Sequence, residues 1–350
     1  MMRKILLGHS EMAKILILAP MATLSHEAFR RMVQKFGGCD EYFTEMINAG
    51  SLLHMGTFEK YYLLSGPEPE KIVWQITGSR ADYMAHAAEI VLEHGGIGVD
   101  LNMGCSAPQI ANTGAGIAWM TKPISEAQKM VHAVKSVIEN VAKDGKTKRL
   151  SVKLRLGDEN FTIEKFFEFT DMLVAEGVQM LTLHPRTKKE KYREPARWKF
   201  VEELALRYPQ IPVILNGDVK DYESFKKATE IAPHSSGVMI ARAAAQKPWI
   251  FSEIRNLAEY KLLEKDDSQI DTEALALQFI NDVEECQPPE FWKTRLQRFF
   301  AYYCLNFSFA HYFQTQMLNA NNNEEARERV KEYFAKCPDD KFIPIKQSKF

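Results

Sequence analysis

Short apolar and β-branched runs alternate with stretches of helical period along roughly the first 250 residues of the chain. The runs are KILILA (14–19), EYFTEM (41–46), KIVWQI (71–76), IGVDLN (97–102), LSVKLR (150–155), LTLHP (181–185), IPVILN (211–216) and GVMIA (237–241). This alternation is typical of repeated βα units around a parallel sheet. Because eight such runs occur, we expect an α/β fold with a closed (β/α)8 TIM barrel rather than an open sheet. The run EYFTEM is the least regular and is equally compatible with the start of a helix.

The sequence changes character after the last run. The segment LLEKDDSQIDTE (262–273) is polar and acidic like a linker, and the residues after it have helical period apart from a break at Pro288 and Pro289. We therefore expect two domains, a TIM barrel over residues 1–255 and a smaller all-helical domain over residues 256–350.

Residues that start and stop helices lie between the predicted strands. Ser79 and Ser125 each precede a helical pattern and are expected to be N-caps. Gly37, Gly95 and Gly177 stand where helices should end, because glycine adopts the left-handed conformation found after a helix C-terminus.

The composition narrows the class of protein. A formal net charge of -1 over 350 residues argues against a protein that coats nucleic acid everywhere, so an RNA partner would need a local basic patch. The five cysteines are odd in number and lack paired spacing, which indicates neither a disulfide framework nor a metal site and fits a reducing cytoplasm. His9, Glu11 and Lys14 interrupt the apolar N-terminal run, so we expect neither a signal peptide nor a membrane segment.

Polar residues gather at the C-terminal ends of nearly all the predicted strands, where the active site of a barrel enzyme forms. In chain order they follow or end the strands as Thr44 and Glu45, Gln75, Asn102 to Cys105, Lys153 and Arg155, His184 and Arg186, Asn216 to Asp218, and Arg242. A single strand end carries a polar residue about as often as not, but their joint occurrence indicates a functional site.

The ends of the last two strands suggest a phosphate site. Asn216-Gly217-Asp218 and Ala241-Arg242 lie in the loops that bind phosphate in many such barrels. Gly217 permits close backbone approach, and Arg242 has the geometry for a bidentate contact. A simple turn is the alternative interpretation of Asn-Gly-Asp.

Lys153 and Arg155 share one face of a strand, which is either the barrel interior or the side that faces the helices. Inside the barrel they would hold an electron-rich ring or a phosphate, and a structural ion pair is the alternative. Cys105 begins CSAPQIANTGAG, a segment that we interpret as a long mobile loop over the barrel mouth. An accessible thiol there would suit an acid or a nucleophile.

Together these motifs resemble the tRNA-dihydrouridine synthases. The resemblance rests on WQITGS (74–79), DLNMGC (100–105), KLRLG (153–157), LTLHPRT (181–187), ILNGD (214–218) and GVMIARAAAQKPWIF (237–251), in this order. The segment KTRLQRFFAYY (293–303) is similar to the basic aromatic helix of the family's helical tRNA-binding domain. Two residues depart from the family pattern: Ser106 replaces a usual proline, and Ala241 replaces a usual glycine and would be tolerated only at negative φ.

The resemblance implies an FMN-dependent oxidoreductase that reduces the C5=C6 bond of a uridine in tRNA with NADPH or NADH. Hydride would pass from flavin N5 to C6, and Cys105 would deliver a proton to C5. The residues that it assigns to FMN are Pro20, Met21, Ala22, Gln75, Lys153, His184, Asn216, Gly217, Asp218, Ala241 and Arg242. Those that it places near the substrate are Asn102, Arg155 and Arg186.

A stacked uridine must be splayed out to reach a flavin, so basic residues are needed to hold the RNA. The candidates are Lys188, Lys189, Lys191 and Arg193 after the sixth strand, and Lys293, Arg295 and Arg298 in the helical tail. For each cluster a solvated face is an equally good interpretation. Two other functions remain open, a different FMN-dependent barrel reductase acting on a free small molecule and a non-catalytic RNA-binding module.

Overall fold

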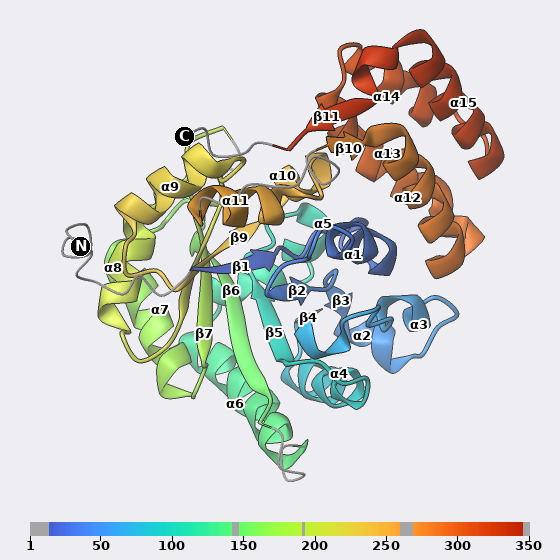
Figure 1. Ribbon diagram of the computed structural model, residues 1–350. Coiled ribbons are helices and arrows are strands. Elements are labelled where there is room, and N and C mark those ends of the chain that lie inside the picture. Colours follow the sequence, from blue (N-terminus) through green and yellow to red (C-terminus); the bar gives the residue numbers. More distant parts are fainter. Residues whose placement is uncertain (1–13, 142–146, 191–192, 260–268, 346–350) are drawn as a thin grey trace, which may run out of the picture.

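The computed structural model describes residues 14–141, 147–190, 193–259 and 269–345. All eight predicted runs form strands, including the least regular one, and together they close a parallel barrel (Figure 1). The strands are β1 (Ile15–Leu18), β2 (Glu41–Phe43), β4 (Ile72–Thr77), β5 (Gly98–Met103), β6 (Arg149–Gly157), β7 (Met180–Thr187), β8 (Val213–Asn216) and β9 (Gly237–Ile240). Closure comes from β1, which pairs with both β2 and β9, while β2 pairs with β4. The short strand β3 (Ile47–Asn48) extends the edge beside the end of β4.

Helices surround the barrel, as the alternating pattern predicts (Figure 1). The longer ones are α1 (Glu27–Gln34), α4 (Ala81–Glu93), α6 (Ile124–Val141), α7 (Ile163–Ala175), α8 (Lys199–Arg207), α9 (Tyr222–Ile231) and α11 (Ile250–Ala258). Shorter ones lie in the loops: α2 (Ala49–Leu53), α3 (Glu59–Tyr62), α5 (Pro108–Ala111), α10 (Arg242–Gln246) and the 3-10 helix η2 (Gly116–Met120). No helix among the described residues is long and apolar enough to cross a membrane.

The expected helix ends are confirmed and the expected caps are wrong. Gly37, Gly95 and Gly177 follow α1, α4 and α7 with φ of 85°, 84° and 85°. Helix α4 has Arg80 at its N-cap, without a hydrogen bond from its side chain, and the carbonyl of Ser79 accepts a hydrogen bond from Lys122 at 3.1 Å. Ser125 lies inside α6, which begins one residue earlier, directly after a proline.

The lower barrel interior is filled by one apolar layer. Ile17, Phe43, Val73, Ile214 and Met239 are each fully buried and pack together at its centre. The inward positions nearer the C-terminal ends of the strands are polar. The barrel is therefore closed below and open to chemistry only at its C-terminal mouth.

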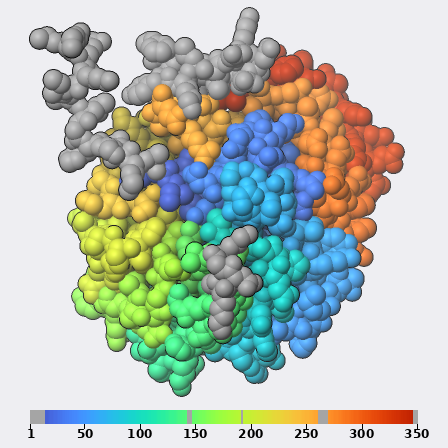
Figure 2. All heavy atoms as spheres, turned by 60° about the horizontal axis from the view of Figure 1, so that its bottom comes forward, coloured from blue at the N-terminus to red at the C-terminus, as the bar shows by residue number. Residues whose placement is uncertain are grey.

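The C-terminal region is helical, as predicted, and lies against the mouth side of the barrel. Its elements are α12 (Thr272–Cys286), α13 (Pro289–Tyr303), α14 (Ala310–Leu318) and α15 (Asn323–Lys336), with β10 (Gln269–Asp271) paired to β11 (Phe342–Pro344). Helix α12 contacts α1 and helix α13 contacts α10. In Figure 2 the orange and red segments border the blue N-terminal ones. A domain boundary at 255–256 stays a prediction; α11 extends to Ala258.

Candidate active site at the mouth of the barrel

Lys153 and Arg155 point into the barrel, which decides between the two orientations that the sequence left open. Ser151 lies on the same face of β6. Its hydroxyl donates to the carboxylate of Asp100 on the neighbouring strand β5 at 2.7 Å, and its register partner on β7 is Met180, which belongs to the apolar layer inside the barrel. Strand alternation places Lys153 and Arg155 above Ser151 on this inward face. Burial and the neighbouring Arg155 lower the pKa of Lys153 to about 8, while Asp100 and Cys105 oppose the shift.

A chain of hydrogen bonds rises from the barrel interior to Cys105. The Gln75 amide donates to Asp100 at 2.8 Å, and its oxygen accepts from the Asn102 amide at 2.8 Å. The Asn102 oxygen in turn accepts the backbone N–H groups of Cys105 at 2.9 Å and Gly104 at 3.3 Å. Because Asp100 accepts the Gln75 amide nitrogen, it fixes which way the Gln75 amide points. These hydrogen bonds therefore hold in place the turn that carries Cys105.

Cys105 lies two residues after the end of β5 and is partly exposed at the barrel mouth. Its carbonyl accepts from Ile117 at 3.0 Å, which ties the turn to η2. Trp119 of η2 donates to the carbonyl of Gly78 at 2.8 Å and so joins the loops after β4 and β5. The segment expected to be one long loop thus contains the short helix α5 and leads into η2, and the backbone of Cys105 is held at both its N–H and its carbonyl.

His184 is held as a neutral acceptor. Arg186 Nη1 lies 2.9 Å from His184 Nε2, and a guanidinium can only donate, so this ring nitrogen accepts. Burial lowers the pKa of His184 well below its ordinary range, and the cations Lys153, Arg155 and Arg186 lower it further. The imidazole therefore adds a hydrogen-bonding group without adding charge.

The predicted phosphate corner is built around Asp218, whose own carboxylate is already engaged. It accepts from Arg186 Nη2 at 2.6 Å and from the backbone N–H of Ala196 at 2.7 Å, and Arg242 lies at 4.0 Å. Asp218 therefore orients the two arginines rather than facing an anion. The side-chain amide of Asn216 donates a hydrogen bond to the backbone carbonyl of Met239 at 2.8 Å.

The backbone of this corner packs closely against His184. Gly217 has φ of 118°, and a Cβ there would lie 2.8 Å from His184 Cδ2. Ala241, which stands where the family usually has glycine, has φ of -111°. A negative φ is the condition under which the alanine methyl group is tolerated there. Arg242 follows with its side chain 48% exposed.

The loop after β1 completes the rim with Pro20, Met21 and Ala22. The Met21 N–H donates to Ser25 Oγ at 2.6 Å, and the Thr23 N–H donates to Glu45 Oε1 at 2.5 Å. Pro20 and Met21 are half-buried, while Ala22 is exposed.

The basic residues expected to contact RNA divide into two groups. Those that keep exposed or partly exposed side chains are Lys188, Lys189, Arg193, Lys293 and Arg298. Lys191 lies outside the described residues. Arg295 corrects the expectation: it is only 3% exposed and forms an ion pair with Glu45 at 2.6 Å. Helical spacing put it on a presumed basic face, but α13 turns this position toward the barrel.

Sequence reasoning missed Asp100, Ser151 and the partner of Glu45. The first two had a signal in the sequence, because Asp100 alternates with Asn102, and Ser151 with Lys153, on the inward faces of β5 and β6. No signal in the sequence pointed to the Glu45–Arg295 pair, since 250 residues separate its members.

The residues at the mouth fit a flavin nucleotide. A buried lysine, two amides and a neutral imidazole offer polar groups to an electron-rich ring, and the half-exposed Arg242 beside the Gly217 turn can donate to a phosphate. The hydroxyl of Thr182, the register partner of Lys153 on the neighbouring strand, is buried without a hydrogen-bond partner among the described residues. Such an orphan is consistent with a polar ligand group above it.

Comparisons with known proteins give a consistent family. The profile described as Dihydrouridine synthase (Dus) matches residues 17–337. A "Probable tRNA-dihydrouridine synthase" of Aquifex aeolicus is 32% identical over 75% of this chain and 79% of its own length. One of Helicobacter pylori is 35% identical over 69% of this chain and 70% of its own. The human "tRNA-dihydrouridine(47) synthase [NAD(P)(+)]-like" is 30% identical over 69% of this chain but only 35% of its own length.

Among solved structures, morphinone reductase aligns with a TM-score of 0.45 at 10% identity, over 69% of this chain and 85% of its own. These likenesses are distant beside the sequence matches. Because the profile covers most of the barrel and the helical region, the chain belongs to the dihydrouridine synthase family.

Proposed function

We propose that this protein is a tRNA-dihydrouridine synthase that reduces the C5=C6 bond of a uridine in tRNA, using NAD(P)H and a bound FMN. The names of its relatives support the reaction and the tRNA substrate, and the name of the human relative supports the nicotinamide reductant. The polar inner face of the barrel mouth supports a flavin. The proposal makes the protein an oxidoreductase.

The FMN would be held by residues from every side of the mouth. Its ring would face Gln75 and Lys153, with His184 beside it, and its phosphate would lie at Gly217 and Arg242. The remaining contacts would come from Pro20, Met21, Ala22, Asn216, Asp218 and Ala241. When bound, FMN supplies the hydride that C6 of the uracil receives. The protein's part is to orient the ring and to exclude water.

Cys105 is the proposed acid, and its placement is the observation that carries the proposal. It is the thiol at the barrel mouth, and its backbone is fixed by Asn102 on the inward face of β5. The Cys105 thiol gives a proton to C5 as C6 gains the hydride, so the double bond is lost and two C–H bonds form. The thiolate then regains a proton from water. A positioned acid of this kind contributes roughly a hundredfold to ten-thousandfold in rate.

Asn102, Arg155 and Arg186 are the proposed contacts to the substrate nucleotide. Asn102 and Arg186 are also tied to the protein, through Gln75 and Asp218 respectively. They are therefore rigid partners for a base that has been splayed out of its stack, which reduces the entropy lost on binding. The exposed cations Lys188, Lys189, Arg193, Lys293 and Arg298 would hold the RNA backbone.

The test is the dihydrouridine content of unmodified tRNA after incubation with NADPH and the purified protein, with Cys105→Ala beside it. We expect the wild-type protein to be yellow and to form dihydrouridine. The variant should lose a hundredfold or more of that rate while its flavin is still reduced by NADPH. Cys337→Ala, which removes a partly exposed thiol in the helical region, is the matched control and should react like wild type.

Each result bears on a separate part of the proposal. Oxidation of NADPH without dihydrouridine would support a reductase of small molecules and refute the tRNA substrate. Equal rates for wild type and Cys105→Ala would refute the assignment of the acid.

A further inference from the structure

The junction between the barrel and the helical region buries a charged pair that the proposed reaction does not use. Arg295 of α13 donates from Nη1 to Glu45 Oε1 at 2.6 Å. Their side chains are 3% and 6% exposed. Glu45 lies between β2 and β3 at the barrel mouth, so the pair joins the mouth to a helix 250 residues away in sequence.

The same oxygen of Glu45 also binds the loop after β1. It accepts the Thr23 N–H at 2.5 Å. Thr23 has φ of 63°, a left-handed conformation that β-branched residues rarely adopt and that surrounding contacts must maintain. One carboxylate oxygen thus links the helical region to the segment that carries Met21 and Ala22, two of the residues proposed to hold the flavin.

Arg295 itself is fixed from the helical side. Its Nε lies 3.2 Å from the oxygen of Gln287, and its guanidinium lies 5.1 Å from the ring centre of Phe291. The side chain of Arg295 is therefore fixed relative to α13. A rigid donor on one side and a strained loop on the other make Glu45 a coupling point.

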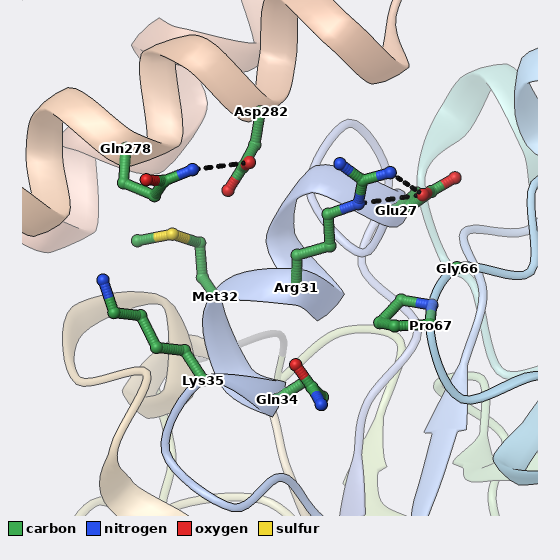
Figure 3. Close-up of a pocket in the computed structure, with 9 residues that line it drawn as sticks. All are labelled: Glu27, Arg31, Met32, Gln34, Lys35, Gly66, Pro67, Gln278 and Asp282. Carbon is green, nitrogen blue, oxygen red and sulfur yellow. Dashed lines mark hydrogen bonds and ion pairs between the residues drawn. The ribbon is translucent and has the colours of Figure 1, made fainter.

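Apolar contacts also join the two parts. The Phe29 and Phe299 rings meet across the junction with centroids 6.1 Å apart. At its edge, α1 and α12 part around a cavity of about 520 Å³ that is lined by Glu27, Arg31, Gln278 and Asp282 among others (Figure 3). A buried ion pair gains little net stability over an apolar pair of the same shape. Its contribution here is the specific connection to Thr23.

We propose that Arg295 and Glu45 are positioning residues through which the helical region holds the β1 loop in its working conformation at the barrel mouth. This inference rests on the proposed function in one respect only, which is the identity of the ligand that the β1 loop binds. In Arg295→Met, Glu45 is left buried without its cation and turns toward water or takes a proton. In both cases its bond to the Thr23 N–H weakens.

The test is hydrogen exchange, followed by mass spectrometry, in the peptide that spans residues 19–26 of the protein without cofactor or tRNA. We expect Arg295→Met to speed exchange in this peptide about tenfold or more, as loss of a hydrogen bond to a charged group should. Arg295→Lys, which keeps a donor and the charge, should restore part of the protection. Arg327→Met breaks another ion pair of the helical region, with Glu284, and should leave the peptide unchanged.

A general loss of stability is separated from the coupling by a second variant. Glu45→Leu with Arg295→Met removes both buried charges, so its Tm should recover toward that of wild type while the β1 loop still exchanges fast. Wild-type exchange of the loop in a folded Arg295→Met protein would overturn the proposal. So would faster exchange spread evenly over the barrel. Neither result depends on dihydrouridine formation, so the two proposals fail separately.

Discussion

Asp100 is a carboxyl group enclosed by the barrel, and its titration is a property that the structure predicts at the scale of one residue. Burial raises the pKa of Asp100 from an ordinary 3.8 to about 6, while hydrogen bonds from Gln75 and Ser151 oppose the shift. The folded protein therefore holds this proton more tightly than the unfolded chain. The associated stability is present below about pH 4 and is lost as the pH rises through about 6, a change of about 3 kcal/mol.

The change that isolates this effect is Asp100→Asn. An asparagine keeps an oxygen for the Gln75 amide and offers its own amide to the Ser151 hydroxyl, so the network survives without the charge. Urea unfolding of both proteins from pH 4 to pH 7 gives the free energy difference at each pH. Relative to the variant, the wild type should lose about 2 kcal/mol over this range, since part of the full change falls below pH 4. A constant difference would mean that Asp100 is not enclosed as described.

At the scale of single residues, the sequence did not predict which way certain side chains point. Alternation on β6 identified Lys153 and Arg155 as neighbours on one face, but it did not distinguish inside from outside. That choice depends on what the neighbouring strands present on the same face, which here is Asp100 of β5 and Met180 of the apolar layer inside the barrel. Arg295 failed for the same reason, because helical spacing groups residues on a face without stating what the face meets.

At the scale of elements, the turn after β8 depends on a glycine for two separable reasons. Gly217 has φ of 118°, and a Cβ there would lie 2.8 Å from His184 and 3.2 Å from Ala196. Gly157, at the end of β6, has φ of 120° but no atom within 4 Å of such a Cβ. We expect Gly157→Ala to cost about 1–3 kcal/mol for the backbone alone. Gly217→Ala should cost a further 1–3 kcal/mol or so through overpacking and should displace His184.

The two glycine variants control for each other, and urea unfolding measures both. Equal costs would show that the turn has room for a methyl group and that the cradle at His184 is looser than described. A larger cost for Gly217→Ala, together with a shifted imidazole signal in the NMR spectrum, would support the tight packing.

The elements themselves were largely predictable. Eight strands and the helical tail follow from periodicity, because barrel strands are buried on both faces and appear as apolar runs. The residues at which the helices begin were less predictable. Ser79 has the residue type of a cap, but the N-cap of α4 is the next residue, Arg80, whose side chain forms no capping hydrogen bond, so residue type alone did not locate this helix start.

At the scale of the whole molecule, the near-neutral charge must be reconciled with an RNA substrate. Lys293 and Arg298 are exposed on α13, the helix whose buried face reaches Glu45. If these two side chains neutralise phosphates, each releases about one counterion when tRNA binds. Binding to tRNA should then weaken with salt, and the slope of log Kd against log salt should fall by about 1 for each cation removed.

The measurement is a salt titration of tRNA affinity for Lys293→Ala and Arg298→Ala, with Lys129→Ala as the matched control. Lys129 is an exposed lysine of α6, which Figure 1 places on the outer wall of the barrel, away from the helical region. Removing it should leave the slope unchanged, since a single distant charge is screened beyond about 10 Å at ordinary ionic strength. Equal slopes for all three variants would place the RNA elsewhere, on the loop of Lys188, Lys189 and Arg193. A reduced slope for the α13 variants alone would show that the exposed face of α13 contacts the RNA.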